Sequence, residues 1–330
     1  MLSNPSRFSP AVCLGVAMQL VLGAGTAMAG NTYYVGTANG GVWKMQDPHS
    51  PTEEVVFNYG GASMLPIVGD WDSDGDDTAG VYDPATGFFF LRNTNSAGPA
   101  DVVLTMGTSL PSQGLIPIAG DWNGDGVDTV GIYSQSGGFF FLKNSNSSGD
   151  ADITFSFGAG GLTPIAGDWN NDGVDTVGLY NPATGAVFLR NTNSPTSGTF
   201  TLTFNGASGY PVSGDWNNDG VDTLGLYNPA TGAWFLKNSN TSGAADIQFN
   251  FSRGGLPVAG ENSPPCDSVD FDCDGDVGTD LDIQAFFDCL GGGPCPPPAC
   301  RNDADFDNDG DTGTDLDIEA FFRVLGGGGC

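Results

Sequence analysis

A repeat of 47 to 51 residues constrains this chain more than any other feature of its sequence. Segments of the form Pro-x-x-Gly-Asp-Trp start at Pro66, Pro117, Pro164 and Pro211, with spacings of 51, 47 and 47 residues. A fifth start, at Pro257, runs as far as Gly260 and then diverges. Repeats of this length are typical of solenoids, propellers and arrays, in which each repeat is one supersecondary unit.

Each repeat contains four short apolar segments and no helical periodicity. In the third repeat the segments are Pro164–Ala166, Thr176–Tyr180, Ala186–Leu189 and Phe200–Phe204, and they are separated by turns rich in Gly, Asn, Pro and Ser. Four short strands bounded by such turns predict one blade of a β-propeller. An open β-solenoid is the alternative.

The two ends of the repeat region predict that the propeller closes on itself. Residues 32–65 match the later strands of a repeat but lack its first strand, and Leu256–Gly260 matches that missing strand. Pairing the two segments removes the exposed edges that an open array would leave. We therefore predict an all-β fold over residues 30–261, a five-bladed β-propeller closed by its N- and C-terminal strands.

The first 29 residues predict export. Arg7 precedes a mostly apolar stretch from Ala11 to Gly25, and Ala27-Met28-Ala29 has the small-x-small pattern of a cleavage site. We therefore expect a signal peptide over residues 1–29 and a secreted, extracellular protein associated with the cell surface; a retained N-terminal anchor is the alternative. No later stretch has the ~18 apolar residues that a membrane-spanning helix needs.

The amino-acid composition limits which partners and cofactors this chain can bind. The chain has 39 acidic and 9 basic residues, a net charge of −30 and one His. This balance argues against a nucleic-acid partner, which requires a basic patch, and one His leaves little room for His-based catalysis or a zinc cluster. Carboxylate and amide oxygens are the ligands that calcium prefers, so composition favours calcium as the cofactor.

Each complete repeat carries the loop Asp-x-[Asp/Asn]-x-Asp-Gly directly after its first strand. Alternate side chains of such a loop converge on one point, the Gly at the sixth position permits a sharp turn, and the seventh residue can add its carbonyl. One such hexapeptide also makes an ordinary turn, but four in register predict metal sites. The predicted calcium ligands, at positions one, three, five, seven and eight, are Asp70, Asp72, Asp74, Asp76 and Asp77; Asp121, Asn123, Asp125, Val127 and Asp128; Asp168, Asn170, Asp172, Val174 and Asp175; and Asp215, Asn217, Asp219, Val221 and Asp222.

The repeats resemble the calcium-loop propeller repeats of the integrin-α and VCBS (FG-GAP) type, over roughly residues 32–260. The resemblance implies calcium ligands at loop positions one, three and five, the carbonyl of position seven and an acidic residue at position nine. This sequence departs from that pattern, because position nine is Thr78, Thr129, Thr176 or Thr223 and an Asp stands at position eight. Either the eighth-position Asp reaches the ion, directly or through water, or the sites are weaker.

A second region follows a predicted linker at residues 262–265. From Glu261 onward the chain has 17 acidic residues against two Arg, and a segment that starts at Asp270 recurs from Asp305 with an offset of 35 residues. Each copy continues into apolar residues at helical spacing. We predict a small α-helical domain over residues 266–330, built from two loop-helix units.

This duplicated tail resembles a dockerin, which implies calcium in each loop and a cohesin-like or cell-wall anchoring partner. The ligands that the resemblance implies are Asp270, Asp272, Asp274, Asp276, Asp305, Asp307, Asp309 and Asp311. Leu281 and Leu316 stand at the twelfth position, where the family has an acid. The expected replacements one place later are Asp282 and Asp317, with Asp280 and Asp315 as rivals.

Six Cys lie in the last 65 residues, which predicts up to three disulfides in an exported domain. Cys330, the final residue, would take part in such a disulfide or, alternatively, would be a covalent attachment point.

Two other sets of residues recur once per complete repeat and are candidates for ligand contacts. The aromatic set follows the first loop Asp and would either stack on sugar rings or pack between blades; its members are Trp71, Trp122, Trp169 and Trp216. The basic set would either grip an anionic polysaccharide or pair with repeated Asp residues; its members are Arg92, Lys143, Arg190 and Lys237.

The function that we expect from the sequence is non-catalytic binding. No repeat departs from the others to build a unique pocket, and His49 lies in a turn-like segment outside the repeats. We expect a surface binding or adhesion module with glycan as the leading ligand class, by analogy with propeller lectins of similar repeat length. The alternatives are a component of an extracellular polysaccharide-degrading assembly, itself enzymatic, and a structural spacer.

Overall fold

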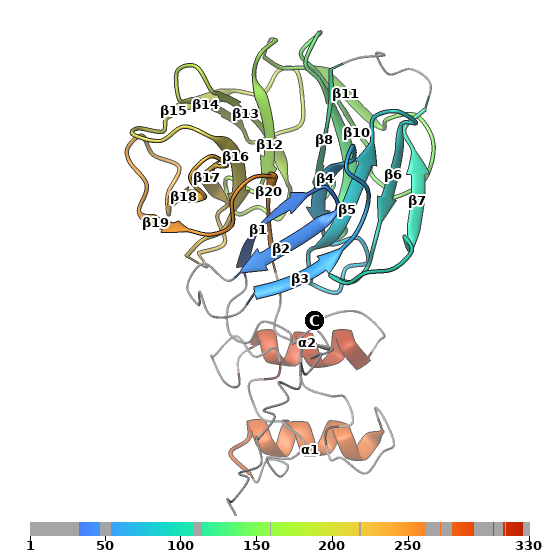
Figure 1. Cartoon of the computed structure of the whole chain (residues 1–330). Helices are drawn as coiled ribbons and strands as arrows, with labels where there is room; N and C mark the ends of the chain where they lie inside the picture. Colours follow the sequence, from blue (N-terminus) through green and yellow to red (C-terminus); the bar gives the residue numbers. More distant parts are fainter. Residues whose placement is uncertain are drawn as a thin grey trace, which may run out of the picture.

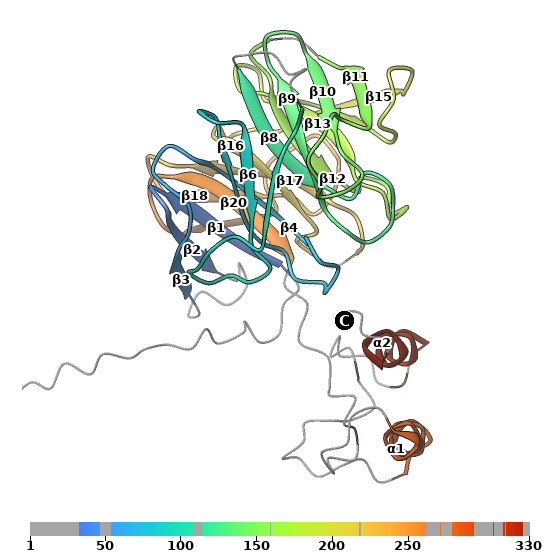
Figure 2. The same ribbon diagram turned by 90° about the vertical axis from the view of Figure 1, so that its right-hand side faces the viewer.

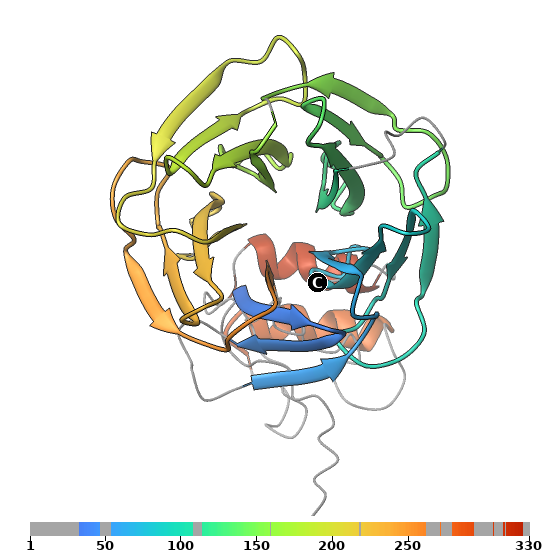
Figure 3. The same ribbon diagram turned by 45° about the horizontal axis from the view of Figure 1, so that its top comes forward.

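A computed structural model describes residues 33–46, 54–107, 114–158, 160–217, 219–261, 279–293 and 315–325, together with residues 271, 306 and 313. The described residues form twenty β-strands and two α-helices. The strands make five separate four-stranded antiparallel sheets, which are arranged as blades around a common axis (Figures 1 and 3). The predicted five-bladed β-propeller is confirmed.

Four blades follow the chain in order, from the innermost strand outward. Blade 2 consists of β4 (Leu65–Gly69), β5 (Thr78–Asp83), β6 (Phe88–Leu91) and β7 (Val102–Thr105). Blade 3 consists of β8 (Leu115–Gly120), β9 (Thr129–Ser134), β10 (Phe139–Leu142) and β11 (Ile153–Ser156). Blade 4 consists of β12 (Thr163–Gly167), β13 (Thr176–Asn181), β14 (Ala186–Arg190) and β15 (Thr199–Thr203). Blade 5 consists of β16 (Tyr210–Gly214), β17 (Thr223–Asn228), β18 (Ala233–Leu236) and β19 (Ile247–Asn250).

Blade 1 joins the two ends of the propeller sequence. Its strand order is β20 (Leu256–Glu261), β1 (Tyr33–Asn39), β2 (Val42–Gln46) and β3 (Glu54–Asn58). Strand β20 is antiparallel to β1, with Cα partners that run from Tyr33 and Glu261 to Ala38 and Leu256. The orphan segment therefore supplies the innermost strand of the first blade, as the sequence predicts, and β1 is paired on both sides like the second strand of every other blade.

The strand register shows which residues of blade 1 correspond to the acidic loops. In blade 2, Gly69 at the end of the inner strand lies opposite Thr78. In blade 1, Gly260 lies opposite Tyr34 in the same way, so Gly260 corresponds to Gly69 and Tyr34 to Thr78. Glu261 therefore occupies the place of the first loop residue, and Tyr33 occupies the place of the eighth. Blade 1 has no continuous loop between these two positions because the chain ends of the propeller meet there.

The apolar core lies between neighbouring blades. Trp71 and Phe89 of blade 2 pack in one buried cluster with Val130 and Ile132 of blade 3, and equivalent clusters follow at the next junctions. Full burial of a large apolar side chain is worth about 1.5–3 kcal/mol. Because each cluster contains side chains from two neighbouring blades, its burial stabilises the contact between those blades.

The two helices lie C-terminal to the propeller sequence (Figures 1 and 2). Helix α1 (Asp280–Leu290) and helix α2 (Asp315–Leu325) bury Phe286 and Phe321, whose rings stack with centroids 4.1 Å apart. Cys289 in α1 is disulfide-bonded, and the other Cys residues lie outside the described residues. Among the described helices, none is long and apolar enough to cross a membrane.

Candidate functional site at the acidic loops

The loop between the first and second strands of each complete blade curls around its first Asp. In blade 2 the carboxylate of Asp70 accepts the backbone N–H groups of Asp74 (3.2 Å) and Gly75 (2.9 Å). The same bond from the sixth-position Gly recurs in blades 3, 4 and 5 at 2.7, 2.8 and 2.6 Å. Gly75 adopts φ 87°, a left-handed conformation that favours Gly. The repeated sequence therefore folds locally into one repeated loop.

This curl brings the alternate acidic side chains of blade 2 together. One carboxylate oxygen from each of Asp70, Asp72 and Asp74 lies within 4.8 Å of the other two. Burial, followed by the neighbouring carboxylates, raises the pKa of Asp72. In blades 3 to 5 the third position is Asn, and its amide donates to the fifth-position carboxylate at 2.8–2.9 Å. The donor set is hard oxygen throughout and fits calcium, whose charge would offset the repulsion within the loop.

The ninth-position Thr side chains do not face this cluster. They are at most 2 % exposed, and each hydroxyl donates to a backbone carbonyl at the end of the third strand of its own blade. Thr78 donates to Arg92 at 2.6 Å, and the same bond recurs at 2.6, 2.6 and 2.5 Å in the next three blades. The acidic calcium ligand that the resemblance to FG-GAP-type repeats implies at loop position nine is therefore absent from these four blades.

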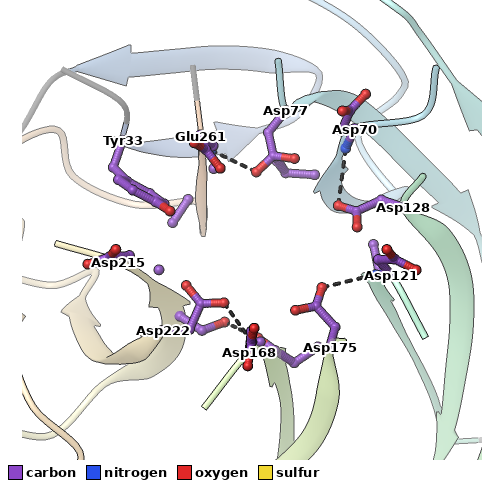
Figure 4. A pocket seen from close by; sticks show the side chains of 18 of the residues that line it. Tyr33, Asp70, Asp77, Asp121, Asp128, Asp168, Asp175, Asp215, Asp222 and Glu261 are labelled. Atoms are coloured by element: carbon purple, nitrogen blue, oxygen red, sulfur yellow. Dashed lines mark hydrogen bonds between the residues drawn. The ribbon is translucent and has the colours of Figure 1, made fainter. Parts of the chain in front are cut away.

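The eighth-position Asp residues form bonds between blades. The Oδ2 atom of Asp128 accepts the backbone N–H of Asp70 in the preceding blade at 3.1 Å, and Asp128 N–H donates to the carbonyl of Asp70 at 2.7 Å. The same carboxylate bond links Asp175 to Asp121, Asp222 to Asp168 and Asp77 to Glu261, at 3.0, 2.8 and 2.7 Å (Figure 4). These side chains lie around the central channel and tie four of the five blade junctions.

The fifth junction, between blades 5 and 1, is built differently. Tyr33 occupies the eighth-position place there, and its ring meets that of Trp216 edge-on at 6.4 Å. Neither Tyr33 nor Glu261 was predicted from the sequence to lie at these blade junctions. The signal for Glu261 was present, since it follows Pro257–Gly260 where the other repeats have their first loop Asp.

One end of the channel is a cavity of about 340 Å³ lined by nine carboxylates. They are Asp70, Asp77, Asp121, Asp128, Asp168, Asp175, Asp215, Asp222 and Glu261. Burial raises the pKa of Asp77 and of Asp222 to about 7 and that of Glu261 to about 8, and neighbouring carboxylates add to each shift. Burial and neighbouring acids also raise the pKa of Asp128 and Asp175. Such a concentration of negative charge attracts cations.

The opposite end of the channel is lined by uncharged side chains. The repeat prolines and the residues beside them line a second cavity of about 160 Å³. Val68, Ala119, Ala166, Ser213 and Ala259 border both cavities and so lie between them. The propeller therefore has one acidic channel mouth and one that is lined by uncharged side chains.

The repeated Trp residues are buried. Trp71, Trp122, Trp169 and Trp216 are 1–4 % exposed. The first three donate their indole N–H to the carbonyls of Thr78, Thr129 and Thr176 at 3.1–3.2 Å. Their rings belong to the clusters between blades and present no open face to a sugar.

The repeated basic residues also point inward. Lys143, Arg190 and Lys237 are 4–7 % exposed. Lys143 donates to the carbonyl of Asp150 at 3.0 Å and lies 3.7 Å from the carboxylate of Asp152. Arg92 and Lys237 have equivalent Asp partners at 3.9 Å, and the guanidinium of Arg190 lies over the ring of Phe157 at 4.0 Å. These residues brace the loop between the third and fourth strands of each blade.

Most of the predicted tail ligands lie outside the described residues, namely Asp270, Asp272, Asp274, Asp276, Asp305, Asp307, Asp309 and Asp311, as does the side chain of Asp317. Asp282 is described and is buried. Its carboxylate accepts the backbone N–H and the hydroxyl of Thr279 at 2.7 and 2.9 Å, which completes a capping box at the start of α1.

Comparison with known proteins identifies no family. No model of a protein family matches the chain, and no curated protein matches it. Among solved structures, a protein of unknown function from Bacteroides caccae has a TM-score of 0.40 at 10% identity, over 66% of this chain and 73% of that one. The structure of BBS1N in complex with ARL6DN has a TM-score of 0.36 at 10% identity, over 66% of this chain and 64% of that one.

Proposed function

We propose that this chain is an exported, non-catalytic, calcium-loaded propeller that acts as a surface binding or adhesion module. The observation that supports the proposal best is the repetition of one oxygen-rich loop in four blades, with the acidic side chains of blade 2 gathered within 4.8 Å. Loaded loops would form a ring of cations beside the acidic channel mouth. The FG-GAP-type character of the repeats and the dockerin-like character of the tail, with its anchoring partner, belong to the same proposal.

Glycan remains the ligand class that we propose for this module. The repeated Trp residues and three of the four repeated basic residues are buried, and the fourth, Arg92, donates to carbonyls of its own loop. The glycan would therefore contact the calcium ions and the loop oxygens instead of an aromatic ring or a basic rosette. Sugar hydroxyls are oxygen donors of the type that calcium accepts. Binding should therefore depend on calcium.

Calorimetry of calcium binding to the secreted chain tests the metal part of this proposal. We expect about four ions more than the same chain binds when Asp70, Asp121, Asp168 and Asp215 are all changed to Asn. Asp83→Asn is the matched control, since Asp83 is an acid on the turn at the other end of blade 2. An equal stoichiometry for the wild type and the fourfold variant would refute calcium loading of the blades.

A glycan array probed with and without calcium tests the ligand. Retention of a glycan in calcium but not in EDTA supports the proposal. Calcium loading without retention of any glycan would remove the glycan part and leave a calcium-stabilised scaffold.

A further inference from the structure

Each complete blade has an Asn whose amide oxygen is buried and has no hydrogen-bond partner among the described residues. This Asn directly follows the repeated basic residue, and the four equivalents are Asn93, Asn144, Asn191 and Asn238. Three further Asn residues, each two positions later, also have a buried amide oxygen without a partner among the described residues, namely Asn95, Asn146 and Asn240. A buried oxygen without a partner costs about 1–3 kcal/mol. Because this cost recurs at the equivalent position of four blades, we expect a ligand to bind these amide oxygens.

The Asn of blade 2 lies against the acidic loop. Its amide nitrogen donates to the Oδ2 atom of Asp72 at 2.6 Å, and Asp72 belongs to the cluster with Asp70 and Asp74. The orphan oxygen is carried on the same planar amide as that nitrogen. Rotation by half a turn about the last side-chain bond of Asn exchanges the two atoms. The bond to Asp72 is then lost, and a cation between the amide oxygen and the carboxylate would have to replace it.

The ninth-position Thr bonds to the residue directly before this Asn in every complete blade. The hydroxyl of Thr78 donates to the carbonyl of Arg92, the residue directly before Asn93. The same bond holds Lys143, Arg190 and Lys237, and an Asn follows each of them. The Thr that replaces the acidic residue thus anchors a backbone segment that carries another oxygen donor.

We propose that Asn93, Asn144, Asn191 and Asn238 each supply the amide oxygen that completes the calcium site of their blade, in place of an acidic ninth loop residue. The inference rests on the proposed calcium loading and assigns ligands from a second loop of the same blade. Each site then draws on the loop after the first strand and the loop after the third, so calcium joins two connections that are far apart in sequence.

Terbium luminescence excited through Trp tests this assignment in the full secreted chain. The part of the chain after Glu261 contains no Trp or Tyr, so Trp excitation reports the propeller sites and not the tail. The parent protein for this test carries three changes that lower the calcium affinity of the loops in blades 3, 4 and 5: Asp125→Asn, Asp172→Asn and Asp219→Asn. Each Asn keeps an oxygen acceptor where the carboxylate was. Blade 2, with its own Trp71, is then the dominant site. Calcium competition then gives the affinity of that site.

In this background, Asn93→Ala should weaken calcium binding by at least about tenfold. Asn93→Asp should bind calcium more tightly than the parent and yet have a lower melting temperature in EDTA, because it adds a fourth carboxylate to the cluster of Asp70, Asp72 and Asp74. Asn95→Ala is the matched control: Asn95 lies in the same loop and its amide oxygen is likewise buried without a partner among the described residues, but its amide nitrogen donates to the backbone carbonyl of Asp77 at 2.9 Å and not to a carboxylate of the cluster of Asp70, Asp72 and Asp74. It should lower stability and leave the calcium affinity within about threefold of the parent.

The outcomes separate the two proposals. Unchanged affinity in Asn93→Ala, or an Asn93→Asp variant that binds calcium no better than Asn93→Ala, would overturn the assignment of Asn93 while calcium loading stands. A parent protein whose terbium signal calcium does not displace would refute calcium loading itself.

Discussion

The carboxylate of Asp128 accepts the backbone N–H of Asp70, 58 residues earlier in the chain and one blade away, at 3.1 Å. The bond is one of four equivalent carboxylate bonds that connect neighbouring blades around the channel among the described residues. It makes the eighth loop residue a structural element of the ring. It also places a negative charge where burial and other acids disfavour that charge.

The bond and the charge of Asp128 can be separated by substitution. Asp128→Asn retains an oxygen acceptor for Asp70 and removes the charge, so we expect a higher melting temperature in EDTA at pH 8. Asp128→Ala leaves a backbone N–H without its acceptor, at a cost of about 1–3 kcal/mol. Differential scanning calorimetry compares the two variants, and an Asn variant less stable than the Ala variant would contradict this role.

The acidic channel predicts an unusual pH dependence for the metal-free propeller. The folded pKa values of Asp77 and Asp222 are about 7 and that of Glu261 is about 8, all above the ordinary values of free carboxyl groups. Between about pH 4 and 8 the folded state therefore binds more protons than the unfolded state, and the stabilisation present at about pH 4 is lost as the pH rises.

Thermal unfolding in EDTA between pH 5 and 8 measures this effect. We expect the melting temperature to fall across the range, and to fall less in a variant with Asp77→Asn and Asp222→Asn. A melting temperature that rises with pH in the wild type would show that the channel carboxylates ionise normally.

Closure by β20 predicts that the last strand of the propeller is essential for stability. Val258 in β20 is 4 % exposed and packs in the core of blade 1. Val258→Asp should destabilise by more than about 3 kcal/mol, because it buries an unpaired charge. Val56→Asp is the control, since Val56 on the outer strand β3 is 55 % exposed and should cost within about 0.5 kcal/mol. Equal urea midpoints for the two variants would refute closure as a source of stability.

The buried basic residues should affect stability and not ligand binding. Lys143→Met retains the apolar stem but removes the bond to the Asp150 carbonyl, with an expected cost of about 0.5–1.5 kcal/mol. Lys44→Met is the control, because Lys44 is exposed and its pair with Glu54 is a surface salt bridge worth about 0–1 kcal/mol. Retention on an immobilised anionic polysaccharide should be equal for both variants. A selective loss in Lys143→Met would instead support the basic rosette.

Much of this fold can be predicted from local sequence patterns. The spacing of the Gly-Asp-Trp segments, the four apolar segments per repeat and the missing first strand predict five blades and their closure, because strand and turn propensities act over a few residues. The curl of the loop around Asp70 follows from the Asp and Gly pattern in the same way. The gathering of Asp70, Asp72 and Asp74 could therefore be predicted before any tertiary contact was known.

The roles of the remaining residues were decided by the tertiary structure. Sequence spacing does not show on which side of a blade a side chain lies, so it could not show that Asp128 bonds to the preceding blade or that Tyr33 contacts Trp216 at the fifth junction. It also could not show that Trp71 and Lys143 are buried, since burial depends on a neighbouring blade some 50 residues away. The sequence determined the repeated unit, and the closed ring of blades determined which of its polar groups face the channel, the loops or the core.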